Sequence, residues 1–291
     1  MPSKTLTIAR IADIFLRLNQ GRDRMLKPRL MFWVDRAGDT MLEELTRSQV
    51  RDALIALKTE PAADGRLRSG PTINRYRAAL GSMIAFARDN DLVSHDWISP
   101  LSGMKQAKEN PGLVRYLSHE EEDRLMAAAE LVRWPLLPLL VRTAIVTGLR
   151  AGALQGLLWA NVKINDDNPR IEVARTKNGE PHVSPLTPDL VVMFRKARRL
   201  GALDTDYVFS GANPHRPHSW RECFAKAMRK ARIEGATFHT LRHTSCSRLA
   251  EAGVDAIAIA EHSGHKTMSM VRRYAHLNVK RRASIVQDVF G

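Results

Sequence analysis

Hydrophobic residues in the first third of the chain recur at steps of three and four. The clearest run follows Pro71 and consists of Ile73, Tyr76, Leu80, Met83 and Phe86. This spacing puts the apolar side chains on one face of an amphipathic helix. The opposite face carries Asn74, Arg75 and Arg77. Similar spacing over 42–57 predicts one or two further helices, so residues 1–103 are predicted to form a small helical domain.

The periodicity stops between residues 104 and 117. This stretch is polar and contains Pro111 and Gly112, which interrupt helices and favour loops. We predict that it is a linker between two domains.

Helical patterns return after the linker. Ser118 and Glu121 have the spacing of a capping box ahead of an apolar run. A second apolar run, residues 136–147, stops at Gly148, a residue suited to ending a helix. These signals predict two successive helices at the start of the second domain.

In the middle of the second domain, the spacing of apolar residues changes from a helical to an alternating pattern. Segments 170–175 and 182–186 alternate like strands, and Asn178-Gly179 between them is typical of a hairpin turn. Helical patterns resume after Pro188 and continue to about residue 276. Residues 118–291 are therefore predicted to form one domain, and the whole chain to be mainly α with a small β-sheet (α+β).

The amino-acid composition indicates the class of binding partner. The 291 residues include 45 Lys and Arg against 31 Asp and Glu, a net charge of +14, which favours a polyanionic partner such as nucleic acid or an anionic membrane surface. The N-terminus lacks a signal-peptide core and no run of about 18 apolar residues occurs, so secretion and membrane spanning are not supported. Cys223 and Cys246 are too few for a disulfide framework and lack metal-binding spacing.

The basic excess is present on both sides of the linker. It amounts to +5 over residues 1–106 and +9 over the rest. Two basic domains joined by a flexible connection could close around a duplex, although ordinary surface charge would give the same count.

Four separate segments of the chain carry side chains suited to binding or activating a phosphate. They are Arg150 in TGLRAGAL, Lys177 in RTKNGE, His239 and Arg242 in FHTLRHT, and His265 followed nine residues later by Tyr274. In this order and spacing, the set resembles the tyrosine recombinase (phage integrase) family. The resemblance extends from about Ser118 onward, and more loosely to the N-terminal helices as a core-type DNA-binding domain. It makes the helix face with Asn74, Arg75 and Arg77 our candidate DNA-binding surface.

The chemistry of phosphodiester attack explains why these residue types are needed. Negative charge develops on the non-bridging oxygens, and the guanidinium forks of Arg150 and Arg242 present paired donors to them. Tyr274 is the predicted nucleophile, and because a phenol with a pKa of about 10 is weak at neutral pH, His239 is the candidate base.

Two further residues complete the predicted catalytic set. Lys177, at the hairpin, is the candidate acid for the departing 5′ oxygen, and His265 would contact a phosphate oxygen or steer the tyrosine. Each side chain has a simpler alternative when taken alone: a solvated lysine at a turn, a helix-terminal histidine, or, for Tyr274, a core tyrosine.

The resemblance implies a reaction and a set of partners. Tyr274 would form a 3′-phosphotyrosyl link that a 5′ hydroxyl from another duplex reseals, with no metal, nucleotide or other cofactor. The expected partner is double-stranded DNA, on which monomers would assemble into a homo-tetramer. Accessory DNA-bending proteins are possible further partners, and no membrane is expected to be involved. We expect a cytoplasmic, nucleoid-associated enzyme that integrates or excises a mobile element.

Three positions depart from the family pattern. Ala153 replaces an acid usually found three residues after the first arginine, Thr240 replaces a common Asp, and Ser263 replaces a common Leu. These changes predict a slower or context-dependent enzyme. Two alternatives remain open: a type IB topoisomerase-like activity that relaxes supercoils, and a catalytically silent DNA-binding remnant.

The sequence leaves the DNA target, the direction of reaction and the phage, transposon or chromosomal role open. Base readout depends on side-chain placement that spacing does not fix. Beyond Tyr274, four apolar residues share one side if the segment is helical, namely Ile285, Val286, Val289 and Phe290. We expect this tail to pack either on its own domain or on a neighbouring protomer.

Overall fold

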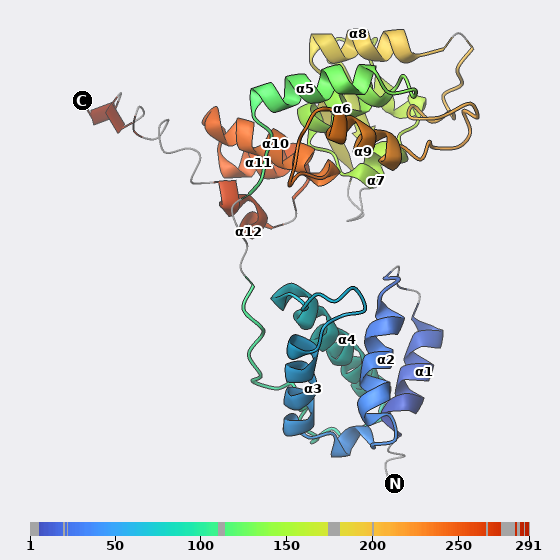
Figure 1. Ribbon diagram of the computed structural model, residues 1–291, viewed down its shortest axis with the longest axis vertical. Helices are drawn as coiled ribbons and strands as arrows, with labels where there is room; N and C mark the ends of the chain where they lie inside the picture. The colour runs from blue at the N-terminus through green and yellow to red at the C-terminus, as the bar shows by residue number, and fades with distance from the viewer. Residues whose placement is uncertain are drawn as a thin grey trace. The chain divides into compact units, whose positions relative to one another are not determined.

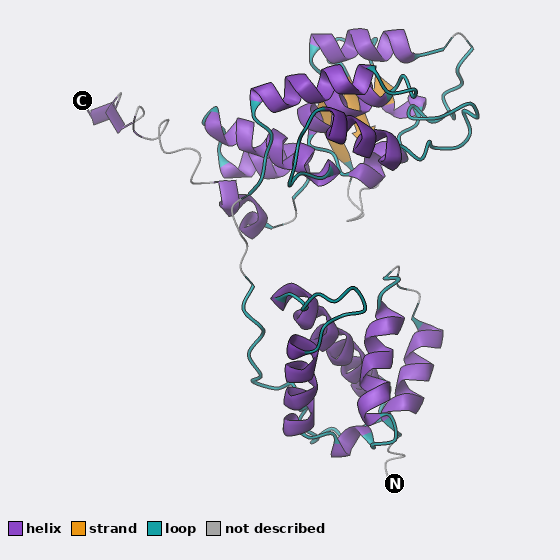
Figure 2. Cartoon of the chain, in the orientation of Figure 1, coloured by secondary structure: helices purple, strands orange, loops and turns teal. Residues whose placement is uncertain are grey.

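The computed structural model divides into two compact units, residues 1–112 and 113–291 (Figure 1). It describes residues 6–19, 21, 23–109, 114–173, 181–199, 201–265 and 267–274, together with 283, 286–287 and 289–290. The described part is mainly helical with one small sheet, as predicted (Figure 2). No described helix is both long and apolar enough to cross a membrane.

Unit 1 is built from helices alone among its described residues. They are α1 (Ile8–Leu18), α2 (Leu26–Ala37), the 3-10 turn η1 (Leu42–Glu44), α3 (Arg47–Thr59) and α4 (Gly70–Asp89). The predicted amphipathic helix after Pro71 is α4, whose Leu80 and Met83 are fully buried. Trp33 of α2 is buried against α4 and donates its indole N–H to the Tyr76 carbonyl at 2.9 Å.

The first part of the predicted linker lies against unit 1. Asn74 accepts the Ala107 N–H at 2.8 Å and donates to the Ala107 carbonyl at 2.9 Å. Arg77 donates to the Met104 carbonyl at 2.9 Å. Two side chains of α4 therefore hold the segment that leaves this unit.

In the described residues of unit 2, helices surround a small sheet. The helices are α5 (His119–Glu130), α6 (Leu137–Thr147), α7 (Ala151–Gln155), η2 (Trp159–Asn161), α8 (Pro188–Ala197), α9 (Arg221–Lys230), α10 (Phe238–Glu251), α11 (Ala256–Ser263) and α12 (Met268–Val271). The strands are β1 (Val162–Lys163), β2 (Arg170–Val173) and β3 (His182–Pro185). The order is β1-β2-β3 with antiparallel pairs, and Ile171 of β2 faces Val162 on one side and Ser184 on the other.

Helix α6 lies in the core of unit 2, and eight of its eleven residues are apolar. Leu137, Leu140 and Val141 are fully buried. A helix with apolar side chains over most of its surface is stable inside a core. It packs against α5, α8 and α10, and the predicted stop at Gly148 is confirmed by its left-handed backbone, with φ at 60°. The predicted capping box at Ser118 and Glu121 is also present.

A buried acid fixes the position of α10, the helix that carries FHTLRHT. Glu122 of α5 is 5% exposed and accepts from Arg142 of α6 at 2.9 Å and from Arg248 of α10. A buried carboxylate is tolerated only when it is paired in this way. The ion pairs therefore link three helices and hold α10 in register against the core.

Candidate active site

Arg242 lies at the junction of two helix ends. Its side chain is buried, and Nη1 donates to the carbonyls of Gly148, at 2.7 Å, and of Ser263. Gly148 and Gly264 both adopt left-handed backbone at the ends of α6 and α11, so carbonyl groups gather there. Such groups carry partial negative charge, which favours a cation.

Arg150 joins the same junction from the other side. It follows Gly148, caps the N-terminus of α7, and donates through Nη1 to the Gly264 carbonyl at 3.1 Å. Burial and the nearby positive charge of Arg150 lower the pKa of Arg242 to about 10. Arg242 therefore remains protonated at neutral pH, and two cations stand close together.

Tyr274 is almost fully buried, with 1% of the residue exposed. Its hydroxyl lies 2.6 Å from Nδ1 of His243 on α10. Burial raises the pKa of the phenol, and the neighbouring Cys246 raises it further. The nucleophile candidate is therefore a neutral phenol in this structure.

Two histidines of α10 stand one turn apart, and one of them, His243, contacts this hydroxyl. The rings of His239 and His243 are 4.6 Å apart and nearly perpendicular. Burial lowers the pKa of both, followed by the charge of Arg242 for His239 and of His239 for His243. The pKa of His243 falls to about 4, so its imidazole is neutral at pH 7. In the tautomer with the proton on Nε2, its Nδ1 accepts the hydrogen bond from Tyr274.

His265 sits immediately beyond the end of α11. Its Nδ1 lies 2.5 Å from the hydroxyl of Ser263. Burial first, and then the charges of Arg242 and Arg150, lower its pKa to about 3. His265 is therefore neutral and is close enough to both arginines to respond to their charge.

The sheet reaches this site through β3. His182 contacts the Ser184 hydroxyl through Nε2 at 3.0 Å. The other ring nitrogen faces Gly264, where an added Cβ would lie 3.4 Å from Nδ1. Burial lowers the pKa of His182, followed by the charges of His262, Arg242 and Arg150.

Five of the six predicted catalytic residues therefore lie within one cluster: Arg150, His239, Arg242, His265 and Tyr274. The sixth, Lys177, lies outside the described residues. Within the described part of the chain, no group of three or more His, Cys, Asp or Glu side chains could hold a metal ion.

The three candidate DNA-binding residues have different environments. Asn74 and Arg77 are half-buried and bonded to the backbone of residues 104–107. Arg75 is exposed on α4. Of the three, Arg75 is the one whose side chain can meet a duplex without first giving up a hydrogen bond to the backbone of this segment.

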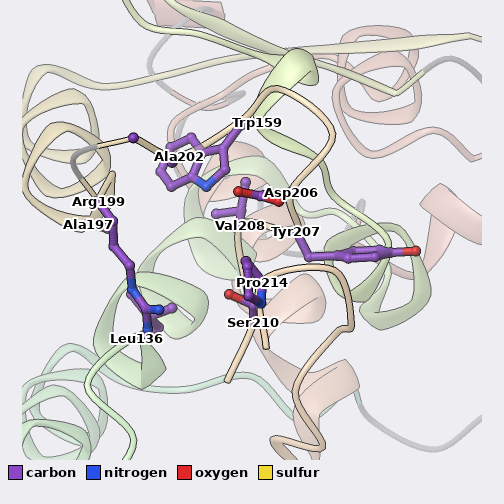
Figure 3. A pocket seen from close by; sticks show the side chains of 11 residues that line it. Leu136, Trp159, Ala197, Arg199, Ala202, Asp206, Tyr207, Val208, Ser210 and Pro214 are labelled. Carbon is purple, nitrogen blue, oxygen red and sulfur yellow. The ribbon is translucent and has the colours of Figure 1, made fainter. Parts of the chain in front are cut away.

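A cavity of about 170 Å³ lies elsewhere in unit 2 (Figure 3). Its wall includes Trp159, Arg199, Tyr207 and the buried Asp206. One oxygen of Asp206 accepts the Leu203 N–H at 2.9 Å and the other lies 3.0 Å from the His215 ring. Asp206 therefore stabilises the loop to which it belongs. None of the predicted catalytic residues lines this cavity.

Comparison with known proteins identifies the family of the domain that contains the cluster. The family model described as the phage integrase family matches residues 115–281, which include every predicted catalytic residue. The chain belongs to the phage integrase family. The candidate cluster, at the junction of α6, α10, α11 and the segment after α12, lies within the matched range.

Individual relatives agree with this assignment. The chain is 27% identical to a shufflon-specific DNA recombinase of Escherichia coli over 82% of its length, and 30% identical to the integrase of Haemophilus phage HP1 over 70%. It spans 58% and 56% of the lengths of these relatives. The Tn1549 transposon integrase, solved in complex with transposon right end DNA, shares the fold with a TM-score of 0.74 at 18% identity, over 98% of this chain and all of that one.

The three departures from the integrase pattern have structural counterparts. The Thr240 hydroxyl accepts the Thr237 N–H at 2.9 Å, which is the role of an acid in a capping box. Ser263 provides the hydroxyl that contacts His265. Ala153 leaves Arg150 without a carboxylate three residues away, and the Gly264 carbonyl supplies a neutral partner instead.

Sequence reasoning missed His243 and His182. His243 follows His239 by four residues in FHTLRHT, so helical spacing alone puts both on one face. That signal was available. His182 gave no comparable signal, because its proximity to Gly264 depends on how the sheet packs on α11.

Proposed function

We propose that this chain is a site-specific recombinase that cleaves and rejoins DNA strands through a 3′-phosphotyrosyl intermediate on Tyr274. The observation that carries the proposal is a buried phenol, hydrogen-bonded to an imidazole, beside a pair of buried or half-buried arginines. Family membership supports the same chemistry, since the relatives matched include a DNA recombinase and an integrase by name.

The chemistry follows from charge. A scissile phosphate entering the site would meet Arg150 and Arg242, whose guanidinium donors stabilise the negative charge that develops as Tyr274 attacks. His265 would contact a phosphate oxygen. The energy of the broken phosphodiester bond is conserved in the phosphotyrosyl ester, so a 5′ hydroxyl can reseal the strand without an external energy source.

Replacement of the nucleophile tests this proposal. Tyr274→Phe removes only the hydroxyl and should leave duplex binding intact, but no protein–DNA adduct should survive denaturation. Persistence of the adduct in this variant would remove Tyr274 from its role. Relaxation of any supercoiled plasmid by the wild-type protein, without a specific site, would instead favour a topoisomerase-like activity.

Lys177 is proposed as the acid that protonates the departing 5′ oxygen. A substrate with sulfur at the 5′-bridging position of the scissile phosphate needs little protonation, because a thiolate leaves readily. It should therefore largely rescue Lys177→Ala. Failure of that rescue, with DNA binding intact, would indicate a structural lysine.

The partners and cellular role belong to the same proposal. Double-stranded DNA is the substrate, and recombination takes place in a homo-tetramer assembled on two duplexes, with accessory DNA-bending proteins where a site requires them. Integration or excision of a mobile element at the nucleoid is the proposed role. Sedimentation with and without a synthetic site tests assembly: a tetramer should appear only with DNA.

A further inference from the structure

The hydroxyl of Tyr274 has one imidazole within hydrogen-bonding distance among the described residues, and it belongs to His243. The phenolic oxygen and Nδ1 are 2.6 Å apart. His239, the histidine that sequence reasoning selected as base, contacts the ring of His243 edge to face at 4.6 Å. Geometry therefore points to His243, a histidine that the predicted catalytic set did not include.

A proton must leave Tyr274 as it attacks phosphorus. The acceptor should lie within about 2.6–3.2 Å of the hydroxyl, or one water away. Nδ1 of His243 meets this condition directly, and it is free to accept the proton in the neutral tautomer that carries its hydrogen on Nε2. The hydrogen bond already lies along the path that the proton would take.

We infer that His243, rather than His239, accepts the phenolic proton of Tyr274 during strand cleavage and returns it during resealing. This inference rests on the proposed nucleophilic role of Tyr274. In cleavage, the bond from the Tyr274 oxygen to phosphorus forms and the bond from phosphorus to the 5′ oxygen breaks. The phenolic proton moves to Nδ1 of His243, and the 5′ oxygen receives a proton from the proposed acid Lys177.

The charges around His243 explain why transfer would wait for DNA. His239 and Arg242 of α10 and Arg273 after α12 all disfavour an imidazolium there, and burial disfavours it further. A phosphodiester bound between Arg150 and Arg242 brings a negative charge that offsets the positive charge of the arginines. His243 therefore becomes a better base when substrate is present, and the phenol is protected from ionising without it.

Single-turnover cleavage of a 5′-bridging phosphorothiolate substrate isolates this step, because the leaving group then needs no acid. His243→Ala should lower the rate at pH 7 by roughly a hundredfold or more, the usual range for loss of a positioned base. Its rate should then rise about tenfold per pH unit as hydroxide replaces the imidazole. The wild-type rate should change little over the same alkaline range.

Added imidazoles give a second measurement. In His243→Ala, rescue should become stronger as the added imidazole becomes more basic, since the missing function is proton acceptance. His239→Ala should lack both the tenfold pH slope and this dependence on basicity. The reverse assignment, with the slope in His239→Ala and a wild-type profile in His243→Ala, would overturn the inference.

Two variants separate proton transfer from simple positioning. His243→Asn keeps a hydrogen-bond acceptor that cannot take a proton at neutral pH, so it should show the same pH slope as His243→Ala. Restoration of the wild-type rate by Asn would contradict the inference. His262→Ala is the matched control, because His262 is a half-buried histidine of α11 bonded to Ser245 and should lack the slope. If Tyr274→Phe still formed the adduct, the proposed function itself would fail, which is a different result.

Discussion

Backbone carbonyls, rather than carboxylates, hold the two arginines of the site. Gly264 accepts from Arg150, and Gly148 and Ser263 accept from Arg242. Among the described residues, no carboxylate forms an ion pair with either guanidinium. A carbonyl is neutral, so it leaves the positive charge of each arginine available to an incoming phosphate. A hydrogen bond to a carbonyl is, however, weaker than one to a carboxylate.

Ala153→Glu should therefore increase the rate of cleavage. A carboxylate one turn along α7 would give Arg150 a charge-assisted partner and reduce its freedom to move. If that hydrogen bond favours the transition state by about 1 kcal/mol, cleavage of a suicide substrate should become roughly fivefold faster. Ala153→Gln is the control for side-chain size, and an unchanged rate in the Glu variant would discard the idea.

Gly148→Ala should weaken both stability and cleavage. Gly148 has φ at +60°, and an added Cβ would lie 3.2 Å from the Ser245 hydroxyl. A side chain in left-handed backbone is strained, and an incompatible Gly-to-Ala change destabilises by about 1 kcal/mol or more. The carbonyl that accepts from Arg242 would shift as well.

Thermal unfolding and single-turnover cleavage check this prediction together. Gly152→Ala is the matched control, because no atom outside the local backbone of α7 lies within 4 Å of its added Cβ. A Gly148→Ala variant with wild-type melting temperature and rate would show that the glycine is not required there.

At the scale of elements, β3 is joined to the end of α11. His182 bonds Ser184 within the strand and faces Gly264, whose carbonyl accepts from Arg150. The strand is therefore linked to the arginine junction through one imidazole. Lys177, the proposed acid, belongs to the segment that connects β2 to β3 in sequence.

His182→Ala should impair the acid step more than the attack step. We expect slower cleavage of an ordinary substrate, with most of the loss removed by a 5′-bridging sulfur, since that leaving group needs no lysine. The comparison is the ratio of the two rates in variant and wild type. An equal loss on both substrates would indicate that His182 supports the fold of the site generally.

The sequence predicted most of these elements because their signals are local. Helix α6 is an apolar run closed by Gly148, and β2 and β3 lie within the two predicted alternating segments. The predicted turn between them at Asn178-Gly179 lies outside the described residues. The two-residue strand β1 is too short to produce an alternating pattern. Its pairing with β2 depends on the packed sheet, which local periodicity does not encode.

The candidate site was predictable in its members and less so in their arrangement. Order and spacing selected Arg150, Arg242 and Tyr274, which the structure brings together. The contact between His243 and Tyr274 required the packing of the segment after α12 against α10. Similarly, the polar face of α4 predicted DNA contacts, whereas Asn74 and Arg77 bond the backbone of 104–107, a segment distant in sequence.

At the scale of the whole molecule, charge is distributed over both units. Residues 1–106 carry +5 and the remainder +9. Each unit also has a hydrophobic core of its own, so each can be studied separately. Both properties suit a protein that binds a duplex with two domains.

Duplex affinity should therefore depend steeply on salt, because binding releases counterions from DNA. The slope of log affinity against log salt should be about −0.9 for each phosphate neutralised. Separating the chain near Pro111 should give two weak binders, each with a shallower slope than the intact chain. Full affinity in either half alone would contradict binding by both domains.

The C-terminal segment provides a test of assembly. Val286, Val289 and Phe290 are 57%, 64% and 84% exposed, and Ile285 lies outside the described residues. Burying a large apolar side chain contributes roughly 1.5–3 kcal/mol, so an exposed group of three favours a partner surface. The proposed homo-tetramer offers such a surface on a neighbouring protomer.

Ending the chain at Arg282 should leave the folded monomer nearly as stable as before and preserve binding to a single site, because these exposed side chains contribute little to its core. The same truncation should abolish the tetramer on DNA and strand exchange. Thermal melting, binding to a half-site and sedimentation with paired sites measure the three properties separately. A large drop in melting temperature would show that the tail packs on its own domain, and normal recombination would show that it is dispensable.

A double variant, Val289→Asp with Phe290→Asp, keeps the full chain length but removes the apolar surface of the tail. It should reproduce the assembly defect if apolar docking is the cause.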